Sequence, residues 1–464
     1  MQPIDLSTRR EMFNDRYLIE TLNGASLYLH EPIPRETVHQ IKKPVENSTA
    51  GCYNLVQENG KILLYYRGYS PPSPADNPQK FEDQQTGNLL ISEDGVNFKR
   101  PELGLVDVEG STLNNVLFRG RQGHNFCVFI DENPAAAPEQ RFKAVGGEGQ
   151  NLLHGFCSPD GIHWEPFHQG PLKVNGMFDS VNVPFWDNYS KCYRLFSRCF
   201  VNGDGSSPYS GFRAIQSCTS EDFVRWTSPE PHRYDEGIPL EHLYTNATMP
   251  CPGAEHILLS FPMRFVPERT VENLKPYMEY PGDGISDAVF MTSRDGVHWD
   301  RTFMEAWVRP GVEERNWTHR NQTPAVGLFT TGPKEWSMYL SEHYGWDTCG
   351  LRRVTIRPHG FSSIRTGYKG GELVTKSLNF SGSTLFLNYS TSAVGSISVE
   401  IQDMDGHSLD GFNLGDMAPM FGDELDAPVL WKSSTNLSQL NGKPIRIKFQ
   451  LKDADLYSLR FGDS

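Results

Sequence analysis

The carboxylates of Asp179, Asp287 and Glu342 carry the clearest indication of chemistry in this sequence. Each stands where a β-strand is expected to begin or end, beside amide, cationic or aromatic residues. Cleavage of a glycosidic bond needs one protonated carboxyl, which donates to the leaving oxygen. It also needs an ionised one, which attacks the sugar or activates water. The three residues are therefore predicted to form a catalytic group.

Their surroundings predict different roles. Glu342 stands in an aromatic stretch (339–346), and apolar surface raises the pKa of a carboxyl, which suits a general acid. Asp179 is expected close to Arg198, stays ionised and serves as base or nucleophile. Asp287 is expected to orient the sugar or to stabilise the transition state.

Each carboxylate also has a structural alternative, which the sequence leaves open. Asp179 could cap its strand or pair with Arg198. Asp287, in a Gly-Ile-Ser-Asp run, could be a turn residue. Glu342 could form a salt bridge with an arginine of an inner strand.

Arginine, asparagine and histidine side chains are expected at the same mouth. Arginine can hold an acid group with two parallel hydrogen bonds, and asparagine offers a donor and an acceptor to adjacent hydroxyls. The candidates for substrate binding are His124, Asn125, Asn182, Arg198, Asn246, Arg264, Glu305, Arg309, Arg320, Asn321 and His343. Glu305 could instead pair with Arg301 or Arg309. With Arg67, the arginines predict a positive mouth and selection for an anionic sugar, on a chain of net charge −14.

A phrase repeated four times indicates what positions these residues. The copies are SEDGVNF from Ser92, SPDGIHW from Ser158, SEDFVRW from Ser220 and SRDGVHW from Ser293. A spacing of about 65 residues is typical of a repeat architecture. Each copy predicts a strand that ends at serine, an Asp-Gly turn and an aromatic residue that packs between neighbouring sheets. Phe223 replaces the glycine in the third copy, so that turn is predicted to differ.

Two apolar runs precede each hairpin, so each repeat is predicted to be a four-stranded propeller blade. A fifth pair of runs (324–329 and 336–345) lacks the repeated phrase, and its outer strands are expected at 351–357 and in the N-terminal segment, such as 25–30. The predicted fold is all-β: a five-bladed β-propeller catalytic domain over 1–364, followed by a β-sandwich over 365–464.

Composition excludes several classes of function. The net charge of −14 argues against nucleic acid and anionic membrane surfaces as partners. The N-terminal residues lack the features of a signal peptide, so a cytoplasmic location is expected, and a removed leader would instead indicate a secreted or periplasmic protein. Eight scattered cysteines predict free thiols. Asp403, Asp405 and Gly406 predict a turn, and no metal or cofactor is predicted.

The repeated hairpins and the phrase DSVNVPFWD (179–187) resemble the five-bladed β-propeller glycoside hydrolases. That superfamily holds invertase-like β-fructosidases and arabinofuranosidase- and xylosidase-like enzymes, and its invertase-like group also carries a C-terminal β-sandwich. The resemblance is one of architecture. The superfamily's three acidic residues stand at the starts of inner strands in the first three blades, and here only Asp179 falls at such a place.

The predicted function is that of a glycoside hydrolase acting on an oligo- or polysaccharide, with an acidic or sulfated sugar favoured. Two alternatives stay open. A polysaccharide lyase would use His124, His343 or Tyr244 as base beside an arginine that neutralises a uronate, and a propeller could bind carbohydrate without cleaving it. Two pocket carboxylates about 5–10 Å apart favour hydrolysis. Histidine and tyrosine beside arginines, without such a pair, favour a lyase.

Overall fold

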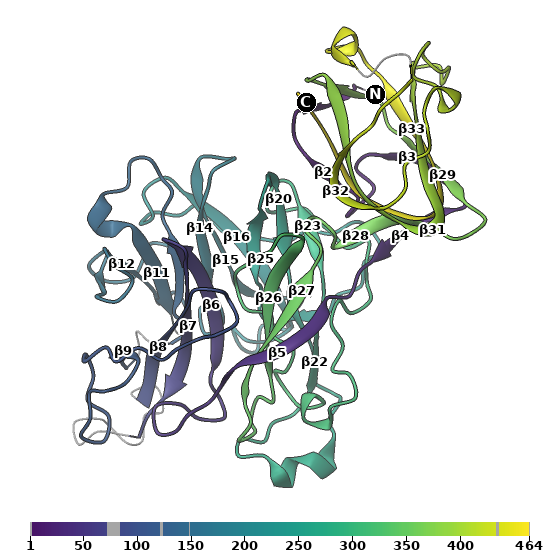
Figure 1. Ribbon diagram of the computed structural model, residues 1–464. Coiled ribbons are helices and arrows are strands. Elements are labelled where there is room, and N and C mark those ends of the chain that lie inside the picture. Colours follow the sequence, from purple (N-terminus) through teal and green to yellow (C-terminus); the bar gives the residue numbers. More distant parts are fainter. Residues whose placement is uncertain (1, 72–83, 121–123, 148, 433–435, 464) are drawn as a thin grey trace. The chain divides into compact units, whose positions relative to one another are not determined.

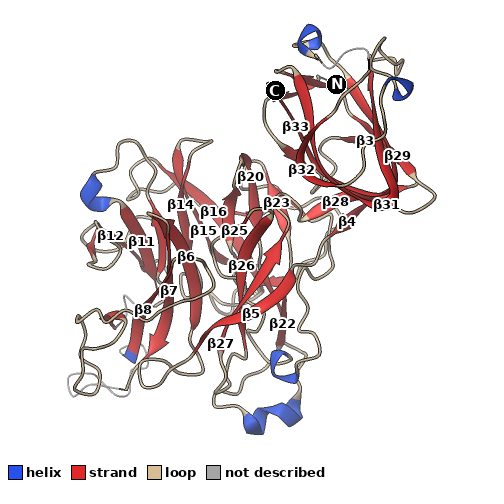
Figure 2. Ribbon diagram, in the orientation of Figure 1, coloured by secondary structure: helices blue, strands red, loops and turns tan. Residues whose placement is uncertain are grey.

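The computed structural model describes residues 2–71, 84–120, 124–147, 149–432 and 436–463. The chain divides into two compact units. Unit 1 comprises Met1–Glu31, Pro252–Ala254 and Ile356–Ser464, and unit 2 comprises Pro32–Cys251 and Glu255–Thr355. Both are built almost entirely of strands (Figures 1 and 2). The described residues contain no helix that is both long and apolar enough to cross a membrane.

Helix is confined to short 3-10 turns in the described residues, as the sequence predicts. These are η3 (Pro138–Gln140), η4 (Glu272–Tyr277), η5 (Glu314–Asn316), η6 (Leu414–Asp416) and η7 (Ser438–Leu440).

Five four-stranded sheets make up most of the described part of unit 2. The first is β6 (Gly51–Glu58), β7 (Lys61–Tyr69), β8 (Gln85–Ser92) and β9 (Val116–Arg119). The second is β10 (Cys127–Ile130), β11 (Phe142–Gly147), β12 (Leu153–Ser158) and β13 (Glu165–Pro166). The third is β14 (Val183–Asp187), β15 (Cys192–Val201), β16 (Phe212–Ser220) and β17 (Glu230–Pro231). The fourth is β19 (Thr248–Cys251), β20 (Ala254–Ser260), β23 (Met291–Ser293) and β24 (Trp299–Asp300). The fifth is β25 (Phe329–Gly332), β26 (Glu335–Glu342), β27 (Gly350–Ile356) and β5 (Ile33–Gln40).

After β20 of the fourth sheet, the chain enters a separate three-stranded sheet. This sheet consists of β18 (His242–Leu243), β21 (Met263–Val266) and β22 (Ile285–Ala288). A single strand was expected across this region. Pro262 separates β20 from β21, and proline has no N–H to donate to a sheet ladder, so the strand breaks there.

The four repeated phrases form one and the same turn. In each copy the serine hydroxyl accepts a backbone N–H three residues on, and the aspartate carboxylate accepts two more. The prediction that the third copy differs is wrong, because Phe223 adopts φ 64° where Gly95 has 73° and Gly161 has 76°. A side chain there is strained. Phe223 offsets the strain by complete burial against Phe129 and Tyr193.

Aromatic residues of these turns pack on the neighbouring sheet, as predicted. The edge-to-face pairs are Phe98 with Tyr339, Trp164 with Tyr65, and Trp299 with Phe196. The Tyr339 and Tyr65 hydroxyls also donate to carbonyls of the turns that dock on them, at 2.8 and 2.9 Å. The turns of the first, second and fourth sheets thus each dock on a neighbouring sheet through the same kind of aromatic contact.

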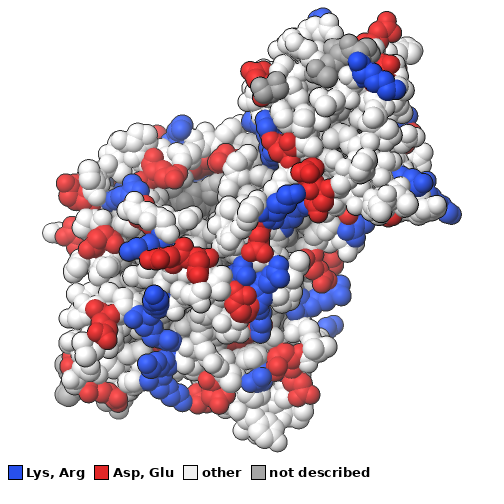
Figure 3. All heavy atoms as spheres, in the orientation of Figure 1, with Lys and Arg blue, Asp and Glu red and all other residues white. Residues whose placement is uncertain are grey.

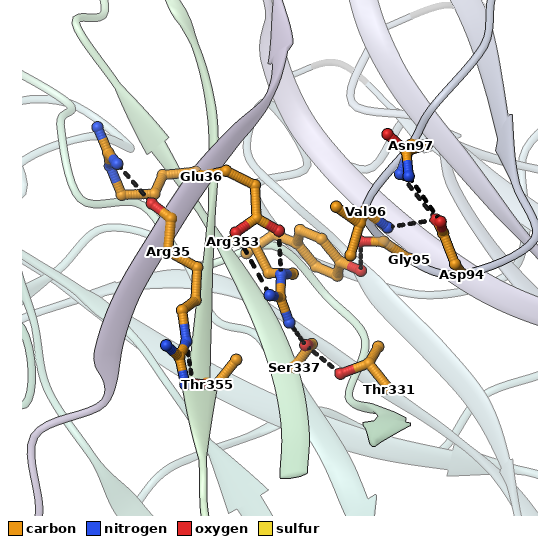
Figure 4. A network of polar contacts seen from close by, with 12 residues as sticks. Arg35, Glu36, Asp94, Gly95, Val96, Asn97, Thr331, Ser337, Arg353 and Thr355 are labelled. Atoms are coloured by element: carbon orange, nitrogen blue, oxygen red, sulfur yellow. Dashed lines mark hydrogen bonds and ion pairs between the residues drawn. The ribbon is translucent and has the colours of Figure 1, made fainter.

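The strand that completes the fifth sheet is β5, and not residues 25–30 as expected. It pairs antiparallel with β27. Arg353 of β27 secures it by donating from Nε to the Glu36 carboxylate at 2.7 Å and from Nη1 to the Ser337 hydroxyl at 2.9 Å (Figure 4). Residues 25–29 form β4 (Ala25–Leu29) in unit 1, where they pair with β28 (Ser362–Thr366).

Unit 1 is organised by two long strands, β31 (Thr384–Gln402) and β33 (Arg446–Gly462), which pair along most of their length. The same eight-stranded sheet includes β2 (Glu11–Met12), β3 (Ile19–Asn23), β29 (Gly371–Thr375) and β32 (Asp423–Pro428), besides β4 and β28. β1 (Ile4–Ser7) and β30 (Leu378–Phe380) form a two-stranded parallel sheet. The buried core includes Phe449, Phe461 and Trp431. The β-sandwich stays a prediction for this unit.

Candidate active site

A cavity of about 610 Å³ lies in unit 2, within the size range of small-molecule sites. Residues on or beside strands of all five four-stranded sheets line it. The structure brings together here five candidates named from the sequence: His124, Asn125, Asp179, Arg320 and Arg67. Tyr244, the base of the lyase alternative, also lines it.

Asp179 is the only carboxylate among the described lining residues. It precedes β14, and its side chain is 34% exposed. It forms an ion pair with Arg198 of β15, whose side chain is 4% exposed. The structural pairing that the sequence left open is therefore present, and Asp179 faces the cavity as well.

The other two predicted catalytic carboxylates do not line the cavity. Asp287 lies opposite Arg264 in the β21–β22 pair and accepts two hydrogen bonds from its guanidinium, at 2.9 and 2.6 Å. Glu342 is buried at the end of β26 and accepts a hydrogen bond from Arg352 at 2.7 Å. The prediction that the three carboxylates lie together is therefore wrong. Asp287 and Glu342 instead form ion pairs with Arg264 and Arg352.

The remaining charged candidates also lie off the cavity lining. Arg264 binds Glu241 at 2.9 Å besides Asp287. Glu305 and Arg309 are exposed. His343 has φ 55°, and burial lowers its pKa.

Three asparagine candidates hold backbone rather than facing the cavity. Asn182 donates to the carbonyls of Phe178 and Ser180, at 3.0 and 2.9 Å. Asn246 is buried and donates to a carbonyl at 3.5 Å. Asn321 accepts the backbone N–H of Tyr344 at 2.8 Å and so fixes a tyrosine that does line the cavity.

Tyr244 is surrounded by cations. The guanidinium carbons of Arg213, Arg198 and Arg320 lie 5.0, 5.3 and 5.6 Å from the centroid of its ring. Burial acts to raise the pKa of Tyr244, but the charges of Arg320, Arg198 and Arg213 outweigh it and lower that pKa. Its hydroxyl makes no hydrogen bond to a described residue and is not sealed from the cavity. Tyr244 is therefore the lining tyrosine whose ionisation its surroundings favour.

Arg67 and Arg320 line the cavity without a carboxylate partner among the described residues. Arg67 donates to the Asn125 side-chain oxygen at 3.0 Å and to the Thr49 carbonyl at 3.4 Å. Arg320 donates to the Tyr344 hydroxyl at 3.0 Å. These neutral acceptors orient two cations and leave their charge uncompensated.

His124 presents one ring nitrogen without a partner. Its Nδ1 lies 2.8 Å from Oε1 of Gln85, which can only accept, so the proton sits on Nδ1. Burial and the positive charge of Arg67 lower the pKa of His124 to about 4. Its Nε2 is buried and makes no hydrogen bond in the described structure. His124 is therefore neutral at pH 7, with an acceptor nitrogen.

Strained backbone gathers at the cavity. Cys52, Asn125 and Arg320 have φ of 55°, 52° and 59°, and all three line it. Left-handed backbone costs a residue with a Cβ about 1–3 kcal/mol, and such strain concentrates at functional sites. The arginine is thereby held by its backbone as well as by its hydrogen bond to Tyr344.

Sequence reasoning missed most of the aromatic lining and one arginine. The additional lining tyrosines are Tyr53, Tyr69, Tyr209, Tyr280 and Tyr344. Arg213 lies near the start of β16, the third strand of its sheet, and was not among the predicted residues. Tyr69 could have been found, since it follows Arg67 in YYRGY.

The described residues contain one cluster of potential metal ligands, formed by Asp403, Asp405 and His407 in unit 1. Asp403 accepts the backbone N–H groups of Asp405 and His407, both at 2.9 Å. This is the turn that the sequence predicted. It belongs to unit 1, whereas the cavity belongs to unit 2.

No protein-family model matches the sequence. A comparison with curated proteins gives no match either. A solved glycoside hydrolase aligns with a TM-score of 0.44 and 12% identity, covering 70% of this chain and 93% of that one. An N-acetylgalactosamine deacetylase from F. plautii gives 0.43 and 12%, covering 72% and 96%. A fructofuranosidase from Schwanniomyces occidentalis gives 0.37 and 9%, covering 92% and 96%.

Proposed function

We propose that the protein cleaves glycosidic bonds of an acidic carbohydrate bound in the cavity of unit 2, with Tyr244 as the group that accepts the proton. One observation carries this proposal: a tyrosine with an open hydroxyl lines the cavity, and three arginines lower its pKa. A general base must lose its own proton near the working pH, and tyrosine does so only where cations favour its phenolate.

The chemistry that these residues fit best is elimination. The Tyr244 phenolate removes the proton from the ring carbon that bears a uronate carboxylate. The electrons of that C–H bond form a double bond to the neighbouring carbon, whose bond to the glycosidic oxygen breaks. The leaving oxygen takes the proton back from Tyr244, so the step needs neither water nor a second acid.

Arg67 and Arg320 are suited to hold the carboxylate of that sugar. Both are positioned by neutral acceptors, and neither has a carboxylate partner among the described residues. A guanidinium binds a carboxylate through charge-assisted hydrogen bonds and stabilises the negative charge that grows as the proton leaves. Acidic and basic side chains are interspersed on the face drawn in Figure 3. The cavity lining differs from that face, because it has two arginines and one carboxylate among its described residues.

Hydrolysis is the second candidate, and Asp179 favours it. Its carboxylate lines the cavity and is 34% exposed, so a bound sugar can reach it. A second pocket carboxylate is missing among the described lining residues. Tyrosine can replace that carboxylate as nucleophile, as it does in sialidases, and Tyr244 would take that role.

Product analysis tests the function and separates the two mechanisms. The protein is incubated with neutral, uronic-acid and sulfated oligosaccharides in water enriched in heavy oxygen, and products are weighed by mass spectrometry. Elimination gives fragments whose masses sum to the substrate, one of them unsaturated and absorbing in the ultraviolet. Hydrolysis adds one labelled water. Binding without any fragment would refute the enzyme and support the carbohydrate-binding alternative.

For the architecture we propose that the five four-stranded sheets are the blades of a five-bladed β-propeller and that the C-terminal region is a β-sandwich. The docking of two of the repeated turns on a neighbouring sheet in the same way supports the first part. The boundary expected between 1–364 and 365–464 is revised to follow the two units. We propose unit 2, completed by β5, as the propeller, and unit 1, which also includes Met1–Glu31, as the β-sandwich domain. An experimental structure with six or seven blades would refute this.

A further inference from the structure

The cavity holds more positive charge than one carboxylate on a substrate would neutralise. Four arginines face it or pack on its lining: Arg67, Arg198, Arg213 and Arg320. Among the described lining residues, Asp179 alone is a carboxylate, and it is already paired with Arg198. Partly buried cations of like sign raise the free energy of the empty site. A ligand with several negative charges relieves that cost.

Arg213 acts on Tyr244 through its charge, but the proposed reaction gives it no contact with the reacting sugar. Its guanidinium carbon lies 5.0 Å from the ring centroid of Tyr244, 5.5 Å from that of Phe265 and 5.9 Å from that of Phe200. No ion pair joins it to a described residue, and its Nε is buried without a hydrogen-bond partner. Burial, together with repulsion from Arg198 and Arg320, lowers its pKa. Three aromatic rings thus position Arg213, and its guanidinium makes no hydrogen bond to a described residue.

Tyr209 and Arg213 pack against the same ring, that of Phe200. Tyr209, in the hairpin between β15 and β16, lines the cavity and is 46% exposed. Its ring stands edge-on to Phe200, with centroids 5.6 Å apart, so its position is set by packing. An exposed tyrosine face at the rim of a cavity can stack on the C–H surface of a sugar. Arg213 and Tyr209 together have the composition of a subsite for a second, acidic sugar.

We propose that Arg213 and Tyr209 form a subsite that binds an acid group, carboxylate or sulfate, on the sugar adjacent to the one that reacts. The substrate is then a polyanionic saccharide with acid groups on consecutive units. This inference rests on the proposed function, because it places the reacting sugar at Tyr244, Arg67 and Arg320.

The test measures affinity, which does not depend on turnover. Tyr244→Phe keeps the ring and removes the hydroxyl, so it serves as the binding form. Titration calorimetry compares oligosaccharides of equal length with acid groups on consecutive units, on alternate units, or on none, in carboxylate and sulfate versions. Each is titrated with and without the added change Arg213→Gln. Arg225→Gln, in the repeated turn of the same sheet and 74% exposed, is the matched control.

We expect Arg213→Gln to weaken binding of the consecutive ligand by about tenfold or more, since a charge-assisted hydrogen bond is lost. Binding of the alternate ligand should change little, and Arg225→Gln should change neither. The acid group that the subsite binds is the one, carboxylate or sulfate, whose ligand loses more affinity on Arg213→Gln. An equal loss for both spacings, no loss, or no binding of any charged ligand overturns the subsite. After an equal loss or no loss, cleavage of a singly charged substrate would still stand, so the subsite fails alone. If no charged ligand binds at all, the proposed function fails as well.

Discussion

The guanidinium of Arg213 lies over the ring of Tyr244, 5.0 Å from its centroid, and Arg198 and Arg320 approach the same ring at 5.3 and 5.6 Å. A phenolate surrounded by three cations is stabilised relative to the neutral phenol, and this outweighs the cost of its burial. The reactivity of the proposed base is therefore set by the arginines that surround its ring.

The pH dependence of turnover should report this relationship. If Tyr244 is the base, the rate rises with pH as its hydroxyl ionises, with a midpoint below 10. Arg213→Gln removes one positive charge, which raises the pKa of Tyr244 and moves the midpoint to higher pH by about one unit. Arg225→Gln should leave the midpoint in place. Identical profiles for all three proteins would show that Arg213 does not act on the ionisation.

Glu342 should matter for stability more than for turnover. Its side chain accepts a hydrogen bond from Arg352 and is buried outside the cavity lining. Glu342→Gln removes the charge that compensates this arginine and should lower the free energy of unfolding by about 1–3 kcal/mol. Urea unfolding and steady-state kinetics measure the two effects separately. A loss of turnover by orders of magnitude in a stable variant would restore the acid role that the sequence suggested.

Acid should destabilise unit 2 through His232. This residue stacks on Trp299 with ring centroids 4.9 Å apart, and neither ring nitrogen has a partner among the described residues. Burial lowers the pKa of His232 from 6.5 to about 3. The unfolded chain therefore binds a proton below pH 6.5 that the folded chain does not. Stability is full above that pH and falls as the pH drops.

At pH 5 the proton on the unfolded chain costs about 2 kcal/mol of stability. His232→Phe keeps the stacking and removes the titration. The difference between the urea midpoints at pH 7 and pH 5 should therefore be smaller in this variant than in the unchanged protein. Equal pH dependence in both would show that His232 titrates normally.

Phe223 should contribute more by packing than it costs in backbone strain. Phe223→Gly relieves the strain at φ 64° but removes a completely buried ring. Deleting a buried phenylalanine side chain costs about 3–5 kcal/mol, and relief of strain returns about 1–3 kcal/mol of it. We expect net destabilisation, measured as a lower urea midpoint. A more stable variant would mean that relief of the backbone strain outweighs the lost packing of the ring.

The hairpins could be predicted from sequence because their chemistry is local. Serine, aspartate and a residue at positive φ close each turn within a few positions, and the strands on either side follow. Phe223 shows where such reasoning ends. Its turn depends on burial against Phe129 and Tyr193, which lie far away in the chain.

The site was predictable only in part, for the same reason. Strand ends identified Arg67, His124 and Asp179, and the structure brings all three to one cavity. Whether a carboxylate faces a cavity or an arginine is decided by register, as Asp287 shows by lying opposite Arg264. No local pattern reveals that pairing.

The measurement that tests the central claim most directly is the turnover of Tyr244→Phe on whichever acidic oligosaccharide the unchanged protein cleaves. The variant lacks only one hydroxyl, so its circular dichroism and unfolding midpoint should match those of the unchanged protein. We predict a loss of turnover of about 10²–10⁴-fold, the usual contribution of a general base, with affinity for the substrate retained. Turnover within a few-fold of normal, in a folded variant, would contradict the assignment of Tyr244 and with it the proposed reaction.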